Sequence, residues 1–162
     1  MNALKLTPVD AWQGWILTGP DSSEALQQAD LPVPQQAFEA LMHGGNLVAK
    51  TGRDEFMAFV LPDARQPLGE WCFRRHDSIF QLSGAAWMAV MAQVCQFDFR
   101  QLQPGDWQML AVAGVNCWLY LSAEPEARLL IGCDPGFSQY LQDNLDAVIA
   151  DVGPISEYPG GA

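Results

Sequence analysis

Residues 82–92 read LSGAAWMAVMA and residues 17–27 read LTGPDSSEALQ, and the likeness of these two stretches decides how the fold is interpreted. In each stretch an apolar run ends in Leu, a hydroxyl residue and Gly follow, and a helix-like segment begins. Gly84 follows Gly19 by 65 residues (84 − 19). Strand-to-helix corners are common, so the match arises either by chance or from an internal duplication of one structural unit. We interpret it as a duplication.

The first half of the chain predicts a strand, a helix and a hairpin. Residues 12–18 have the side chains of a strand, and the proline after Gly19 suits the first turn of a helix over 20–29. Residues 35–45 fit either a helical turn closed by two glycines or an irregular connection. A hairpin is predicted over 46–61, with its turn in KTGRD.

The second half repeats this order. Residues 71–83 form either one long strand or two strands with a polar interruption at 74–78. A helix follows over 85–94, and residues 108–123 are predicted to form either a strand pair or one long strand bent at Gly114. A buried strand and an amphipathic helix are predicted within 128–150.

Together these elements predict an α+β fold: a duplicated strand-helix-hairpin unit that forms a mostly antiparallel sheet with helices packed on it. We expect a single domain over residues 1–152, with pseudo-repeats at about 10–62 and 70–125 and the strand and helix of 128–150 after them. Residues 153–162 lack periodicity and are predicted to be a flexible tail.

Composition narrows the classes of function. The net charge is −11, and no basic cluster exceeds the pair Arg74-Arg75, so binding to nucleic acid or to a membrane surface is not expected. No apolar run approaches the roughly 20 residues of a membrane span. The four cysteines are widely spaced, and no secretory signal is visible, so we expect a cytoplasmic chain with reduced thiols.

A low charged fraction raises the question of a partner. Charged residues make up 17% of the chain, below the roughly 25% usual for soluble domains. Either the core is large and rich in aromatic residues, or one apolar face is covered by a partner. The six tryptophans are interpreted mainly as core, with one or two anchoring a partner.

The best polar constellation is RRHDS, residues 74–78. Arg74 and Arg75 have the chemistry to clamp a carboxylate or phosphate, and Asp77 to orient His76 or accept from a pterin-like amide. On a strand, however, Arg74 and His76 face one side while Arg75 and Asp77 face the other. Ligand binding by Arg74, Arg75 and Asp77 therefore stands beside an alternative in which these residues pair with the acidic surface or protect a sheet edge. No catalytic residue and no metal ligand is predicted.

Four stretches, in their order and spacing, carry a family resemblance. They are LPVP…GGNLVAKTGRDEFMAF, FRRHDSIFQLSGAAWMAVMAQVCQFDF, QPGDWQMLAVAGVNCWLYL and RLLIGCDPGFSQYLQDNL, within roughly residues 14–149. The chain resembles the gamma subunit of heterotetrameric sarcosine oxidase, whose fold is that of the folate-binding domain of the glycine-cleavage T-protein. The family often has Ser-His-Arg on the strand before Leu-Ser-Gly, where this chain has residues 74–78, and the acidic C-terminal tail is unfamiliar.

The resemblance implies a non-catalytic structural subunit that docks a flavin-dependent N-methyl amine oxidoreductase of one-carbon metabolism. It places flavin and tetrahydrofolate in larger partner subunits and implies no cofactor bound by this chain. The alternative is a free-standing folate or small-carboxylate binding protein, or an aminomethyltransferase-like domain, that uses Arg74, Arg75 or Asp77. A third reading is an isolated chain that forms a homo-oligomer through an apolar face.

Overall fold

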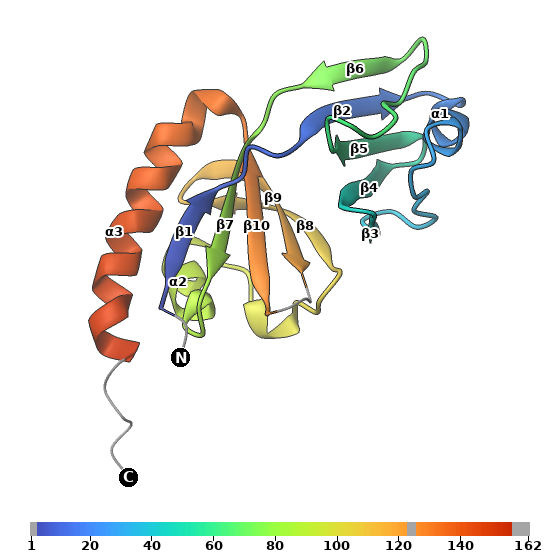
Figure 1. Ribbon diagram of the computed structural model, residues 1–162. Helices are drawn as coiled ribbons and strands as arrows, with labels where there is room; N and C mark the ends of the chain where they lie inside the picture. The colour runs from blue at the N-terminus through green and yellow to red at the C-terminus, as the bar shows by residue number, and fades with distance from the viewer. Residues whose placement is uncertain (1–2, 123–125, 157–162) are drawn as a thin grey trace. The chain divides into compact units, whose positions relative to one another are not determined.

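The computed structural model describes residues 3–122 and 126–156, with side chains described up to residue 153 (Figure 1). The chain divides into two compact units. Unit 1 comprises Met1–Val9, Ser78–Pro104 and Gln108–Ala162, and unit 2 comprises Asp10–Asp77 and Gly105–Trp107. Each unit is built around a five-stranded sheet.

The sheet of unit 1 has the strand order β1-β7-β10-β9-β8, and the pairings of β1, β7, β10 and β9 are antiparallel. Its elements are β1 (Lys5–Pro8), β7 (Ser78–Ser83), α2 (Trp87–Val94), η1 (Phe99–Gln101), β8 (Trp107–Val112), β9 (Val115–Ser122), β10 (Arg128–Cys133), η2 (Pro135–Phe137) and α3 (Ser138–Ser156). The helices α2 and α3 contact each other, and α3 also contacts β1.

The core of unit 1 follows from strand alternation. Every second residue of β7, β9 and β10 points to the face that the helices cover. Leu82, Leu119 and Ile131 are examples, and they pack with Met91 of α2 and Leu145 of α3. The 3.6-residue period gives each helix an apolar face, and the two-residue period gives the strands another. These faces pack against each other in one buried layer.

The sheet of unit 2 has the order β3-β4-β5-β2-β6, with antiparallel pairing throughout. Its elements are β2 (Gln13–Thr18), α1 (Ser22–Gln28), β3 (Ala40–His43), β4 (Asn46–Gly52), β5 (Glu55–Val60) and β6 (Cys72–Arg75). Leu17, Phe56 and Ala58 of the sheet pack with Leu26 of α1 in its core.

The two sheets have corresponding strand orders. Read from its other end, the sheet of unit 1 has the order β8-β9-β10-β7-β1. This order corresponds, strand by strand, to the order β3-β4-β5-β2-β6 in unit 2. In each, three consecutive strands form a meander, and the strand before the helix pairs with the third of them. A short strand from elsewhere in the chain forms the last edge: β1 pairs with β7, and β6 pairs with β2.

The predicted α+β class with antiparallel strands is confirmed, as are the strand over 12–18, the hairpin over 46–61 and the two-strand reading of 71–83. The duplicated unit and the single domain over 1–152 stay predictions. The helix of the C-terminal region continues to Ser156, beyond the predicted start of a tail at 153, and residues 157–162 lie outside the described residues.

Both readings of residues 35–45 were wrong, because part of this segment is a strand. β3 pairs with β4 through a turn at Gly44 and Gly45, whose φ angles are +58° and +81°. Two consecutive positive φ values are the geometry of a two-residue hairpin turn, which a Gly-Gly pair adopts without strain. The same pair that suggested a helix end therefore closes a hairpin.

We expect Gly132→Ala to destabilise the protein. Gly132 of β10 lies opposite Trp118 of β9, and a Cβ at position 132 would collide with the buried indole ring. Displacing a packed ring costs about 1–3 kcal/mol of unfolding free energy. Urea denaturation should show this loss, whereas Gly52→Ala in β4, where the nearest atom to the added Cβ is the Cβ of Glu55 at 3.4 Å, should cost less. Equal stability of the two variants would contradict the packing argument.

Candidate functional site

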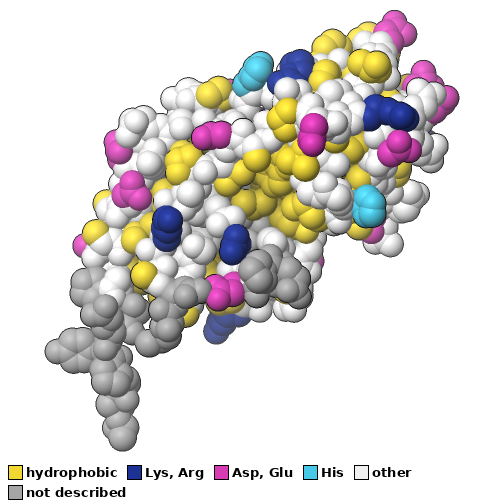
Figure 2. Space-filling view, viewed as in Figure 1, with side chains coloured by type: hydrophobic (Ala, Val, Ile, Leu, Met, Phe, Trp, Pro, Cys, Tyr) yellow, Lys and Arg dark blue, Asp and Glu magenta, His cyan; other side chains and the backbone are white. Residues whose placement is uncertain are grey.

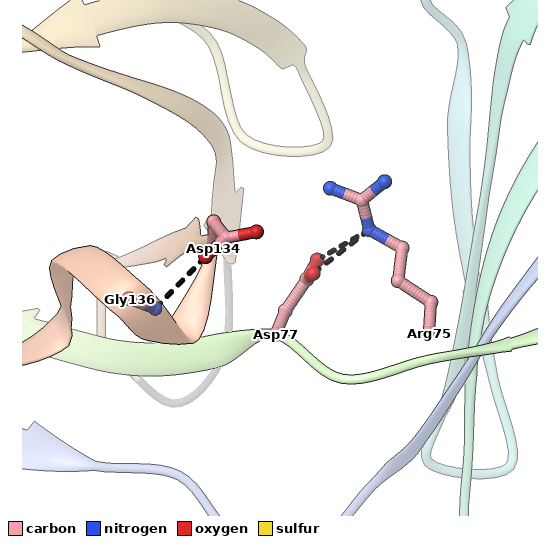
Figure 3. Close-up of polar contacts among 4 residues, drawn as sticks. All are labelled: Arg75, Asp77, Asp134 and Gly136. Carbon is pink, nitrogen blue, oxygen red and sulfur yellow. Dashed lines mark hydrogen bonds and ion pairs between the residues drawn. The ribbon is translucent and has the colours of Figure 1, made fainter.

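The predicted polar site lies at the end of β6 and in the residues that follow it. Arg75 donates from Nε to both carboxylate oxygens of Asp77, at 2.8 and 3.0 Å (Figure 3). The Asp77 side chain is 2% exposed and that of Arg75 is 36% exposed. The guanidinium therefore compensates a carboxylate that is almost fully removed from water. Figure 3 also shows Asp134, which accepts from Gly136 N–H at 2.8 Å and starts η2.

Arg74 makes different contacts on the opposite face of the strand. It lies across from Trp15, and its guanidinium carbon is 4.9 Å from the centroid of that ring. Its Nη1 donates to Gln13 Oε1 at 2.9 Å. The structure thus brings Arg75 and Asp77 together and holds Arg74 elsewhere, as strand alternation requires. A ligand-binding role for Arg74, Arg75 and Asp77 stays a prediction.

Two aromatic side chains on the same edge were not singled out from the sequence. Trp71 and Phe73 are 52% and 48% exposed, and their ring centroids are 6.3 Å apart. Figure 2 shows hydrophobic side chains among scattered charged ones at the surface. The two-residue spacing of Trp and Phe on a strand was visible in the sequence. Their exposure depends on β6 being the last strand of its sheet, which the local sequence does not state.

A second candidate is an apolar hollow in unit 1, where α2 ends. It has a volume of about 660 Å³, and its lining includes Val94, Cys95, Phe97 and Leu110. A neighbouring hollow of about 610 Å³ shares Cys95 and Phe97. The charged residues beside it, Asp98 and Arg100, are paired with each other at 2.8 Å. The lining offers apolar contact more than polar recognition.

Hydrogen bonding and burial shift the pKa values of two groups in unit 1. The hydrogen bond from the Arg100 side chain, with a further one from its backbone N–H, lowers the pKa of Asp98 from 3.8 to about 2. Burial raises the pKa of the Cys117 thiol to about 12, so this residue stays a protonated hydrophobe at neutral pH.

Within residues 3–122 and 126–156, no cluster of three or more His, Cys, Asp or Glu side chains is arranged to hold a metal ion. None of the helices in that part of the chain has the length and hydrophobicity of a membrane span.

The fold is that of a known oxidase component. One solved structure that matches is a chain of "Heterotetrameric Sarcosine Oxidase from Corynebacterium sp. U-96 in complex with pyrrole 2-carboxylate", with a TM-score of 0.79 and 18% sequence identity. The match covers 98% of this chain and 88% of that one. The expected resemblance to a heterotetrameric sarcosine oxidase is therefore confirmed at the level of the fold. No family model and no curated protein matches the sequence.

We expect Arg75→Ala to cost more stability than Arg74→Ala. Loss of Arg75 removes the donor that both oxygens of the buried Asp77 carboxylate share, at a cost of about 1–3 kcal/mol. Arg74 is exposed, and its loss should cost less than about 1 kcal/mol. Urea denaturation of the two variants provides a matched comparison on one strand. Equal losses of unfolding free energy would show that the Arg75–Asp77 pair adds no more stability than the contacts of Arg74.

We expect Arg100→Gln to return the pKa of Asp98 towards 3.8. Since the folded pKa lies below the unfolded one, the stabilising effect of ionised Asp98 is present above 3.8 and is lost as the pH falls towards 2. An NMR titration of the Asp98 carboxyl carbon in both proteins measures the shift. The same midpoint in both proteins would exclude the Arg100 side chain as the cause of the shift.

Proposed function

We propose that this chain is a non-catalytic structural subunit of a flavin-dependent N-methyl amine oxidoreductase of the sarcosine oxidase type, active in one-carbon metabolism. The observation that carries the proposal is the fold match over 98% of the chain to a component of a heterotetrameric sarcosine oxidase. In this proposal the chain corresponds to the gamma subunit. Flavin and tetrahydrofolate belong to larger partner subunits, and the assembly resides in the cytoplasm.

The contacts on β6 support a structural role. Both oxygens of the Asp77 carboxylate accept hydrogen bonds from Arg75 within the chain, an arrangement that needs no ligand to compensate the buried charge. Trp71 and Phe73, by contrast, present half-exposed rings on the same edge. Exposed aromatic residues of this kind are enriched in protein–protein interfaces.

We also infer that the fold is a duplication of the T-protein type. The corresponding strand orders of the two sheets support it. The sequence offset supports it as well: β2 and β7 start at Gln13 and Ser78, and α1 and α2 start at Ser22 and Trp87, each 65 residues apart (78 − 13 and 87 − 22). The unit would be two strands, a helix and three strands, with the first strand of each copy paired in the other copy's sheet.

The proposal is tested by purifying the tagged chain from its native cells at moderate salt. We expect a yellow complex in which larger flavin-containing chains accompany this one at fixed stoichiometry, identified by mass spectrometry and an absorbance spectrum. The untagged strain serves as control. Recovery of the chain alone, colourless and monomeric by light scattering, would sink the proposal.

The same material distinguishes the alternative of folate or small-carboxylate binding. Tetrahydrofolate added to the purified chain alone would then raise its melting temperature, and Arg75→Met would abolish the rise. The subunit proposal expects no such shift.

A further inference from the structure

The last edges of the two sheets are corresponding positions with different chemistry. The edge strand β1 of unit 1 ends in Pro8 and is contacted by α3. Proline, charged side chains and covering elements are the usual means by which a protein protects a sheet edge. Its counterpart β6 reads CFRR and carries no proline, and of its two charged residues Arg75 is paired with Asp77 while Arg74 lies over the ring of Trp15.

The side chains of β1 and β6 also differ on the face of each sheet that points away from its helices. Thr7 of β1 lies across from Gln81, on the face of the sheet away from the helices. On β6, the corresponding face carries Phe73, across from Ile16, together with the neighbouring ring of Trp71. One edge therefore presents a polar side chain where the other presents two half-exposed aromatic rings.

The register also shows which backbone groups of β6 point outwards. Thr18 N–H donates to Trp71 C=O at 3.0 Å, so Thr18 and Trp71 form a hydrogen-bonded pair. Because such pairs alternate along an antiparallel ladder, the backbone groups of Phe73 and Arg75 turn towards β2. Those of Arg74 turn to the other side, where another strand can pair with them.

Charge indicates the kind of strand that fits. Arg74 is exposed and belongs to none of the three ion pairs recorded among the described residues. A carboxylate on an added strand would find a cation there. A second copy of this chain fits poorly, because it would bring Arg74 and Arg75 against their own counterparts and each copy carries a net charge of −11.

We propose that an extended segment of the larger flavin-containing subunit adds to β6 as a sixth strand. This inference rests on the function proposed above. In that segment apolar and acidic residues alternate: apolar side chains pack on Trp71 and Phe73, and a carboxylate on the opposite face pairs with Arg74. Strand addition of this kind takes affinity from backbone hydrogen bonds and specificity from alternate side chains.

The first test is hydrogen exchange on the purified complex and on the isolated chain. We expect the amide of Arg74 to exchange at least about tenfold more slowly in the complex. The amide of Phe73 is bonded to β2 in both states, so its exchange should change little. It is an internal control one residue away.

The second test compares variants in binding to the purified flavin-containing subunits. Phe73→Ser and Arg74→Glu should each raise the Kd about tenfold or more, and both positions are exposed enough to leave folding intact. Met42→Ser is the matched control. Met42 lies on β3, the opposite edge of the same sheet, and is 40% exposed.

The outcomes separate the two proposals. A complex that forms with an unprotected Arg74 amide, and with equal affinities for Phe73→Ser and Met42→Ser, overturns strand addition and leaves the subunit proposal standing. No complex with flavin-containing chains overturns both. A dimer of this chain alone that Phe73→Ser dissociates would show that a second copy occupies β6, and would also overturn the inference.

Discussion

Each sheet is completed by a strand that belongs, by its place in the sequence, beside the other sheet. β1 immediately precedes β2 but pairs with β7, and β6 precedes β7 but pairs with β2. Unit 1 is therefore assembled from three separate segments of the chain. Contacts of such long sequence separation slow folding and tie the two ends of the chain to its middle, so that cutting the sequence at a unit boundary does not release a complete sheet.

The polar segment after β6 connects a strand of one sheet to a strand of the other. The chain leaves one sheet at Arg75 and enters the other at Ser78, with only two residues between the strands. The side chain of Asp77 in this connection is 2% exposed, and Arg75, two residues away, donates to both of its oxygens. Two of the residues that look like a ligand clamp in the sequence, Arg75 and Asp77, are bonded to each other in this connection.

Much of this fold could be predicted from periodicity, and the failures have identifiable causes. The hairpin over 46–61 and the C-terminal helix have strong patterns of their own. β3 was missed because Gly-Gly closes helices and hairpins alike, and only pairing with β4 decides between them. The four residues of β1 are too few to show a period, and they form a strand because β7 accepts them. The exposure of Trp71 and Phe73 is likewise a property of strand order.

The distant partner of β1 also matters while the chain is being made. Lys5 pairs with Ser83, so 78 residues (83 − 5) separate the two ends of that ladder. At synthesis rates of about 5–20 residues per second, the first strand leaves the ribosome roughly 4 to 16 s before its partner. During this interval β2 is its nearest available neighbour, and Pro8 lacks the N–H that one rung of that incorrect pairing would need. The proline that ends the edge strand of the finished sheet thus also disfavours a premature hairpin on the nascent chain.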